Sequence, residues 1–320
     1  MEQIIIGIDI GGTTAKLGLI SNEGDILDKW QIPTNTNDGG IHIIHDIWDS
    51  ITKKIEAKGM KQGQILGIGI GAPGFIEDET GFIYEAVNIG WRDYPLGDLL
   101  KKRAQLPVFV ENDANVAALG ENWRGSGHQV ANLIAITLGT GVGGGIIANG
   151  RIINGEAGLG GEIGHIIIEK DGASCNCGKK GCLETIASAT GIVRQAKQKA
   201  EEFPKSKLAS IIATNGTITT KDVFQLAAEG DQDAEQIVAR TADVLGMAIA
   251  TMGVILNPAK VLIGGGVSKA GEPLLSAIRE AFDRYALPKV NQTCELALAQ
   301  LGNDAGIIGA AYLVKQKLQK

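Results

Sequence analysis

Residues 4–20 (IIIGIDIGGTTAKLGLI) decide the fold, and residues 133–149 (LIAITLGTGVGGGIIAN) repeat their design further along the chain. In each stretch an apolar run predicts a β-strand, a glycine-rich segment predicts a tight turn, and a second apolar run predicts another strand. Residues 8–13 align with residues 136–141 at a constant offset, although few residues are identical. The two stretches are a repeat of shape, and they predict an α/β protein with two related lobes facing a shared cleft.

The composition fits a globular enzyme that holds a charged ligand against its main chain. The chain has 320 residues, of which 44% are hydrophobic, so two domains with sizeable cores are expected. Its 45 glycines favour tight turns and close backbone approaches. The formal net charge of −6 argues against binding to nucleic acid or to an anionic membrane, because both attract positively charged proteins. With no secretory signal and no apolar stretch long enough to cross a bilayer, we expect a soluble, cytoplasmic protein without nucleic-acid or membrane partners.

Hydrophobic periodicity predicts the other elements. Strands are expected at 4–10, 16–20, 25–31, 65–70, 108–111, 133–138, 146–149, 259–263 and 295–299. Helices are expected at 41–58, 96–104, from about 112, and at 183–200, 220–229, 234–256, 273–285 and 304–318. Residues 202–219 lack clear periodicity and predict a surface excursion.

Both glycine-rich turns are candidate phosphate-binding sites, because glycine lets several backbone N–H groups point into one concavity. Gly11, Gly12 and Thr13 lead into a strand-like run, which excludes a Walker loop because that motif opens a helix. Asp9 interrupts the apolar strand before this turn, and we weigh a role in holding Mg²⁺ or its waters against a purely structural role. Thr137 has the matching position before the second turn, where its hydroxyl can donate to phosphate.

A cluster of sulfur and imidazole ligands predicts a structural zinc site. His165, Cys175, Cys177 and Cys182 follow the spacing H-x9-C-x-C-x4-C. Three thiolates and one imidazole complete a tetrahedral set and leave no open position for a catalytic water. The alternative is that these are ordinary thiols, but such a cluster rarely arises by chance.

Two acidic residues flank this predicted zinc knuckle. Metal binding through one nitrogen of His165 would orient the other, which could then hold a substrate hydroxyl. Glu162 and Glu184 lie on either side of the knuckle in the sequence. Each is a candidate ligand contact or, equally, a solvated carboxylate.

Asp113 is the candidate general base. It lies where the strand predicted at 108–111 ends and a helix begins, so a role as the helix N-cap competes with a role in catalysis. The helix dipole would lower its pKa, but phosphoryl transfer needs an oriented proton acceptor more than a strong one. The local sequence leaves both roles open.

Five motifs in one order give a more specific signal than any of them alone. They are residues 9–13 (DIGGT), 111–115 (ENDAN), 138–145 (LGTGVGGG), 161–165 (GEIGH) and 175–184 (CNCGKKGCLE). Together they resemble the ROK family of repressors, open reading frames and sugar kinases, and they are most similar to its bacterial glucokinases. The resemblance spans nearly the whole chain.

The resemblance implies an actin-like ATPase fold, related to ribonuclease H, with the active site in a cleft between two lobes. It places residues 1–112 and 303–320 in an N-terminal lobe and residues 113–302, with the zinc knuckle at 165–182, in a C-terminal lobe. The implied reaction is phosphorylation of the glucose 6-hydroxyl by ATP with Mg²⁺, in a homodimer or homotetramer. Asp113 would be the base.

The resemblance also implies the binding residues. Sugar contacts would come from Asn112, Asp113, Glu162, His165 and Glu184, with Gly74 and Asn88 as weaker candidates. ATP contacts would come from Asp9, Gly11, Gly12, Thr13, Thr137, Gly139, Thr140, Gly141, Gly143, Gly265 and Gly266.

Other functions compete with a glucokinase. Kinases of N-acetylmannosamine, fructose or allose share the same motifs, and their specificity lies in loops such as 81–94. ROK repressors carry a DNA-binding domain before the sugar-binding body, whereas here the first strand is predicted from residue 4, so a sugar-sensing protein is a weaker alternative. The closed Cys₃His set argues against a zinc hydrolase.

Overall fold

A computed structural model describes residues 3–319, and its internal contacts divide the chain into two units. Unit 1 comprises Met1–Gln129, Gly145–Gly161 and Gln300–Lys320. Unit 2 comprises Val130–Gly144 and Glu162–Ala299. Unit 1 is therefore assembled from three separate segments of the chain.

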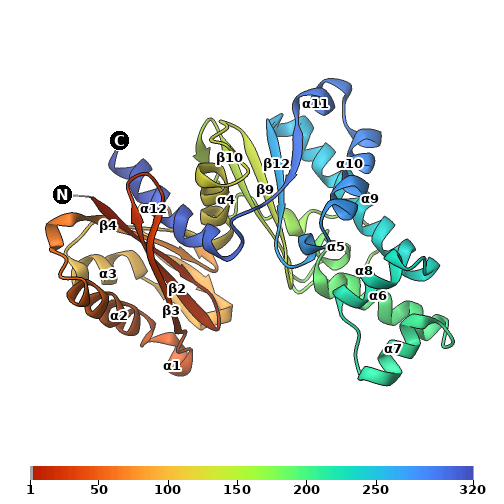
Figure 1. The fold of residues 1–320 in the computed structure, drawn as a ribbon, viewed down its shortest axis with the longest axis horizontal. Helices are drawn as coiled ribbons and strands as arrows, with labels where there is room; N and C mark the ends of the chain where they lie inside the picture. Colours follow the sequence, from red (N-terminus) through yellow and green to blue (C-terminus); the bar gives the residue numbers. More distant parts are fainter. Residues whose placement is uncertain (1–2, 320) are drawn as a thin grey trace. The chain divides into compact units, whose positions relative to one another are not determined.

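Unit 1 contains a five-stranded sheet in the order β3-β2-β1-β4-β8. Figure 1 labels β2, β3 and β4 of this sheet. Its strands are β1 (Ile4–Ile10), β2 (Thr14–Ser21), β3 (Ile26–Pro33), β4 (Ile65–Ala72) and β8 (Val108–Asn112). β2 runs antiparallel to both β1 and β3, whereas β4 runs parallel to both β1 and β8. The strand predicted at 4–10 is confirmed, and the other four predicted strands of this sheet differ only at their ends.

Helices cover both faces of this sheet. The central strand β1 accordingly carries apolar side chains on each of its two faces. Ile4, Ile6 and Ile8 belong to a core that includes α2 (Ile43–Ala57) and α3 (Leu96–Ala104), whereas Ile5 packs with α12 (Ala305–Leu318). Unit 1 also contains α1 (Asn37–Gly40), α4 (Asp113–Arg124) and a small sheet of β5 (Phe75–Ile76), β6 (Ile83–Ala86) and β7 (Trp91–Tyr94). We did not predict the small sheet, because its strands are very short. Buried strands with apolar residues on both faces are typical of sheets covered by helices.

α12 lies against the sheet and against α4 at distances that only glycine permits. A Cβ on Gly7 of β1 would lie 2.0 Å from the carbonyl oxygen of Ile307, and one on Gly69 of β4 would lie 1.8 Å from that of Ala310. A Cβ on Gly309 would lie 1.6 Å from the carbonyl oxygen of Val116 in α4. This packing groups residues 113–129 with unit 1, while the lobe boundary predicted at residue 112 stays a prediction.

Gly309→Ala is expected to lower the free energy of unfolding by about 3 kcal/mol, because the helices must separate to admit the methyl group. Urea denaturation of the variant measures this loss. Gly63→Ala is the matched control, since a Cβ there meets no heavy atom within 4 Å and should leave the midpoint unchanged. A Gly309→Ala protein with the wild-type midpoint would contradict the close helix packing.

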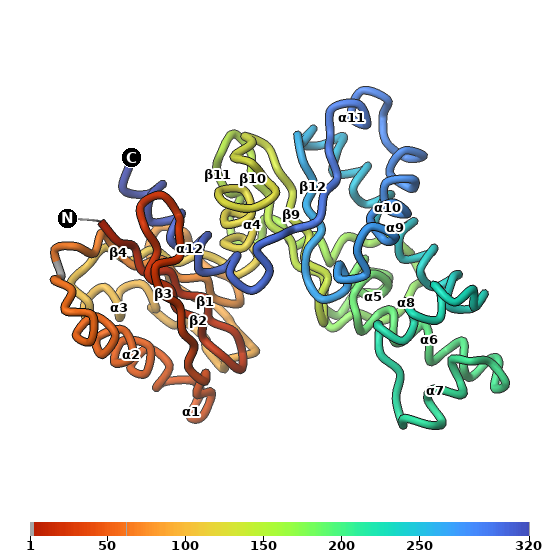
Figure 2. Tube along the Cα trace, in the orientation of Figure 1, coloured from red at the N-terminus to blue at the C-terminus, as the bar shows by residue number. Residues whose placement is uncertain are grey.

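Unit 2 is built on parallel strands covered by helices. β9 (Leu133–Leu138) and β13 (Glu295–Leu298) both run parallel to β12 (Lys260–Gly264), and Figure 2 shows β9 beside β12. The sheet order is β11-β10-β9-β12-β13, and the division between the units falls within β10 (Val142–Ala148), which precedes β11 (Arg151–Ile152). The helices are α5 (Glu184–Ala187), α6 (Ala189–Glu202), α7 (Lys207–Asn215), α8 (Thr220–Ala228), α9 (Gln232–Leu256), α10 (Glu272–Tyr285) and α11 (Pro288–Thr293).

One prediction in unit 2 is wrong, and another is incomplete. The single helix expected at 183–200 is broken at Ser188, whose backbone is extended (φ −77°, ψ 165°) and whose hydroxyl caps α6 by accepting from Gly191 N. The surface excursion expected at 202–219 contains α7, which begins after Ser206 as its N-cap. Periodicity is weak in α7, because Leu208 is its one buried side chain among the described residues.

α9 corrects the statement that no apolar stretch is long enough to cross a membrane. It has 25 residues and a mean hydropathy of 1.5 in its most apolar window, which meets the requirement by length and composition. However, 61% of that window is buried within the structure, and core helices of soluble proteins pass the same test. The absence of a membrane partner stays a prediction.

Candidate active site

The turn from β8 to α4 holds Asp113 at the first position of a helix. Asn112, with φ −60° and ψ 144°, is the N-cap: its Oδ1 accepts from the backbone N–H of Ala114 at 2.9 Å and of Asn115 at 3.3 Å. Asp113 Oδ1 accepts from Ala114 N at 2.8 Å. The cap role weighed for Asp113 is therefore wrong, because Asn112 fills it.

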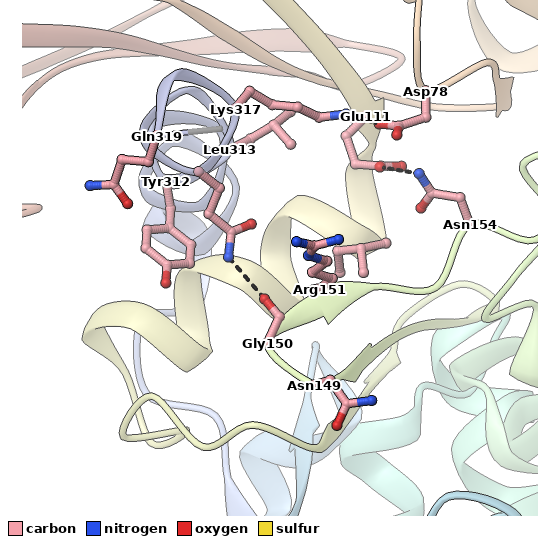
Figure 3. A pocket seen from close by; sticks show the side chains of 12 residues that line it. Asp78, Glu111, Asn149, Gly150, Arg151, Asn154, Tyr312, Leu313, Lys317 and Gln319 are labelled. Atoms are coloured by element: carbon pink, nitrogen blue, oxygen red, sulfur yellow. Dashed lines mark hydrogen bonds and ion pairs between the residues drawn. The ribbon is translucent and has the colours of Figure 1, made fainter.

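Glu111, which the sequence analysis did not select, holds this turn by accepting hydrogen bonds from residues of the turn. The residue is 4% exposed, and its Oε1 accepts from Asn112 N at 2.7 Å and Asn115 Nδ2 at 3.0 Å. Oε2 accepts from Asn154 Nδ2 at 2.9 Å (Figure 3). Burial raises the pKa of Glu111, and these donors oppose the shift. A charged residue inside an apolar strand was the signal for it.

A cavity of about 460 Å³ lies beside Glu111, within unit 1. Figure 3 shows Glu111 and Asn154 on one side of it and residues of α12 on the other. Lys317 Nζ lies 2.6 Å from Asp78 Oδ1 and Gln316 Nε2 donates to Gly150 O at 2.9 Å, so polar contacts tie α12 to the rest of the lining.

The first glycine-rich turn is held by β3 and adjoins two predicted site residues. Thr34 Oγ1 donates to Gly11 O at 2.7 Å. A Cβ on Gly12 would lie 3.5 Å from the carbonyl oxygen of Asn88, so that residue is close to the turn. Gly74 is close to the turn that holds Asp113 instead, because its carbonyl accepts from Asn112 Nδ2 at 3.2 Å.

Asp9 lies at the end of β1 with one cationic neighbour. Burial raises its pKa, and Lys16, whose Nζ is 3.5 Å from Asp9 Oδ2, partly offsets this effect. Gly306 of α12 leaves space for the carboxylate, since a Cβ there would lie 2.6 Å from Asp9 Cγ. A partly buried carboxylate with a single cation beside it is a suitable oxygen ligand for Mg²⁺ or its waters.

The second glycine-rich turn connects β9 to β10 and is held at three points by one segment. Ala189 N donates to Gly139 O at 2.8 Å, and Thr190 Oγ1 donates to Thr140 O at 2.7 Å. Glu184 Oε2 accepts from Val142 N at 3.1 Å. All three partners lie in residues 184–190, which contain α5 and the start of α6.

The remaining predicted phosphate residues adjoin this turn. Thr137 is in the last residue pair between β9 and β12, where it lies opposite Gly264. Gly143 lies in β10. Gly265 follows β12 with φ 87°, and a Cβ there would lie 2.5 Å from the carbonyl oxygen of Leu138. A Cβ on Gly266 would meet no heavy atom within 4 Å, so its backbone is open to a ligand.

Two cavities of unit 2 share Thr140, Thr190 and Arg194 in their lining. One, of about 420 Å³, also includes Gly141, Cys175, Asn176 and Glu184. The other, of about 690 Å³, also includes Ala189, Val193, Lys197 and Ile218. Arg194 was missed by sequence reasoning; its Nη2 donates to Thr185 O at 3.0 Å, and burial lowers its pKa.

The four predicted zinc ligands converge. The ligand atoms of His165, Cys175, Cys177 and Cys182 all lie within 4.8 Å of one another. His165 Nδ1 is 3.6 Å from Cys175 Sγ, and Nε2 is 3.8 Å from Glu162 Oε2. The set therefore fits a tetrahedral zinc ion bound through Nδ1, with Nε2 beside the acidic residue.

The family model described as "ROK family" matches residues 5–317. The chain belongs to the ROK family. It is 53% identical over 317 residues to a glucokinase from Halalkalibacterium halodurans, covering 99% of this chain and 96% of that protein. The predicted membership is confirmed.

Two solved structures resemble this ROK protein along nearly all of its length. A ROK family glucokinase from Streptomyces griseus, in complex with glucose and AMPPNP, has a TM-score of 0.78 and 37% identity, covering 98% of this chain and 99% of that one. A ROK hexokinase from Thermus thermophilus has a TM-score of 0.84 and 31% identity, covering 99% of both chains. The predicted actin-like ATPase fold is confirmed.

The predicted site residues divide between the two units. Asp9, Gly11, Gly12, Thr13, Gly74, Asn88, Asn112 and Asp113 belong to unit 1. Thr137, Gly139, Thr140, Gly141, Gly143, Glu162, His165, Glu184, Gly265 and Gly266 belong to unit 2, with the cysteines. Each unit thus carries one glycine-rich turn together with predicted sugar contacts.

Proposed function

We propose that this ROK protein is an ATP-dependent glucokinase that transfers the γ-phosphoryl group of ATP to the 6-hydroxyl of glucose. The observation that carries the proposal is its 53% identity, over 99% of the chain, to a glucokinase. The Streptomyces griseus relative, at 37% identity, holds glucose and an ATP analogue together. Catalysis would rest on positioning the two substrates and on stabilising the phosphates.

Asp113 would accept the proton of the sugar hydroxyl. As that oxygen bonds to the γ-phosphorus, the bond from phosphorus to the β–γ bridging oxygen breaks and ADP leaves. The Asn112 cap and the Glu111 network support this role, because they fix the backbone on both sides of Asp113. A fixed carboxylate suits a reaction that depends on the orientation of the acceptor.

ATP would bind through both glycine-rich turns. The backbone N–H groups of residues 11–13 and 139–143 would donate to the phosphates, with the hydroxyls of Thr13, Thr137 and Thr140. The 690 Å³ cavity beside Thr140 suits a nucleoside, because Val193 and Ile218 line it. Mg²⁺, held near Asp9, would neutralise phosphate charge.

Sugar hydroxyls would be bound by Asn112, Asp113, Glu162, His165 and Glu184, with Gly74 and Asn88 contributing least. A structural zinc ion on the Cys₃His set would hold the His165 ring, leaving Nε2 to bind a hydroxyl beside Glu162. Glu184 Oε2 already accepts from Val142 N, and Oε1 lies 3.5 Å from Cys175 Sγ, so a sugar hydroxyl would share Oε1 with that thiol. A cytoplasmic homodimer or homotetramer stays a prediction.

The test is Mg-ATP-dependent ADP release with glucose, mannose, fructose, allose, glucosamine and N-acetylmannosamine, against a control without sugar. Strong release with glucose alone supports the proposal. Preference for another sugar keeps the mechanism and changes the substrate. Sugar binding without any ADP release would instead support a non-catalytic sugar sensor.

A further inference from the structure

Residues 183–190 connect the last zinc ligand directly to the second glycine-rich turn. Leu183 and Glu184 follow Cys182 without a gap, and all three anchors of the turn come from Glu184, Ala189 and Thr190. Two of these anchors hold carbonyl oxygens, and the third holds the N–H of Val142. The path of the turn thus depends on where this segment lies.

Glu184 also restricts the turn sterically. A Cβ on Gly141 would lie 2.2 Å from Glu184 Oε2, so the carboxylate lies directly on the backbone of the turn. Its other oxygen, Oε1, is 3.5 Å from Cys175 Sγ. One side chain therefore contacts both the phosphate turn and a metal ligand.

The segment is fixed to the knuckle by several bonds as well as by chain continuity. Thr185 Oγ1 donates to Cys182 O at 2.7 Å, and Leu183 N donates to Ile166 O at 2.8 Å. Cys182 itself forms an antiparallel bridge with Ile167. Movement of the cysteines would consequently move the start of α5.

Ser188 transmits the position of α5 to α6. It is fully buried: its hydroxyl donates to Glu184 O at 2.7 Å and accepts from Gly191 N at 3.0 Å. The same oxygen is 2.9 Å from Thr190 Oγ1, which holds Thr140. Ser188 lines neither of the two cavities described for unit 2, so its effect on a ligand there would pass through its neighbours.

We infer that the Cys₃His knuckle positions the second glycine-rich turn through residues 183–190, so that metal binding sets the affinity for nucleotide as well as for sugar. The inference rests on the proposed function, because it takes the turn as a phosphate site. Structural metal sites are coupled to local folding, and loss of the ion would release Cys182 and then Glu184. The turn would keep its glycines but lose the anchors that align its N–H groups.

The first experiment removes the metal from the full-length protein with a chelator, confirms the loss by atomic absorption, and measures the Kd for Mg-ADP by calorimetry without sugar. We expect Mg-ADP to bind about tenfold more weakly, and added zinc to restore the affinity. A metal-free protein that keeps its circular dichroism spectrum and its affinity for Mg-ADP would overturn the inference.

The second experiment keeps all metal ligands in place. Ser188→Ala should weaken Mg-ADP binding about fivefold at full metal content, although the side chain cannot touch the nucleotide. Ser206→Ala is the matched control, because Ser206 caps α7 of the same unit in the same way and contacts none of residues 183–190 among the bonds described. Equal affinities in the two variants would overturn the inference.

The two hypotheses fail differently in these measurements. A wild-type protein that binds no Mg-ADP would overturn the proposed function and the inference together. A wild-type protein that binds Mg-ADP and phosphorylates glucose, with unchanged affinity after metal removal and in Ser188→Ala, would overturn the inference alone.

Discussion

Asp113→Ala is expected to lower kcat for glucose phosphorylation about a thousandfold while leaving the Kd for Mg-ATP nearly unchanged. The side chain proposed to take the hydroxyl proton is lost, whereas the phosphate turns stay intact. The fold should persist, because Asn112 and not Asp113 is the N-cap of α4. Steady-state kinetics with calorimetry of Mg-ATP binding separates the two effects.

Asp98→Ala is the matched control for this substitution. Asp98 is an exposed carboxylate in the first turn of α3, in the same unit, so its loss removes a comparable helix-dipole interaction without touching the site. Its kcat should equal that of the wild type. Near-normal turnover by Asp113→Ala would rule out the base assignment.

Cys177→Ser is expected to lower the zinc content and to weaken glucose binding at least tenfold. A hydroxyl is a poor replacement for a thiolate ligand, and without the ion His165 is no longer held in one orientation. Atomic absorption on the purified variant measures the metal, and calorimetry measures the Kd for glucose.

Cys294→Ser controls for the loss of a thiol. Cys294 is a buried free cysteine that does not belong to the Cys₃His set, so the variant should retain its metal even if it is less stable. Full glucose affinity in a Cys177→Ser protein without bound zinc would refute the role given to the knuckle.

The strands of the five-stranded sheet in unit 1 were predictable because local pattern and tertiary environment agree. Both faces of β1 are covered by helices, so its apolar run, interrupted only by Gly7 and Asp9, indicated its limits correctly. The break at Ser188 was not predictable from periodicity, since apolar residues continue on both sides of it. It depends on side-chain hydrogen bonds to Glu184 and Gly191, which compete with the helix.

The candidate site shows the same limit. The spacing of the cysteines sufficed to predict a cluster that the structure brings together, because a short loop leaves few alternatives. In contrast, the bond from Val142 to Glu184 joins positions far apart in the sequence, and no local pattern contains it. Asn112 was selected as a sugar contact, yet its side chain also caps α4, which only the structure reveals.

The packing of α12 has a consequence for how the chain folds. Gly7, near the start of the chain, touches the backbone of Ile307, near its end. Residues 162–299 of unit 2, by comparison, form one continuous run. During synthesis the face of the unit 1 sheet that packs against α12 is therefore covered only in part, by α4, until the last helix is made. By then residues 162–299 have already been synthesised. Contacts between such distant residues form slowly. Until they form, the exposed apolar part of this sheet face can bind chaperones or aggregate.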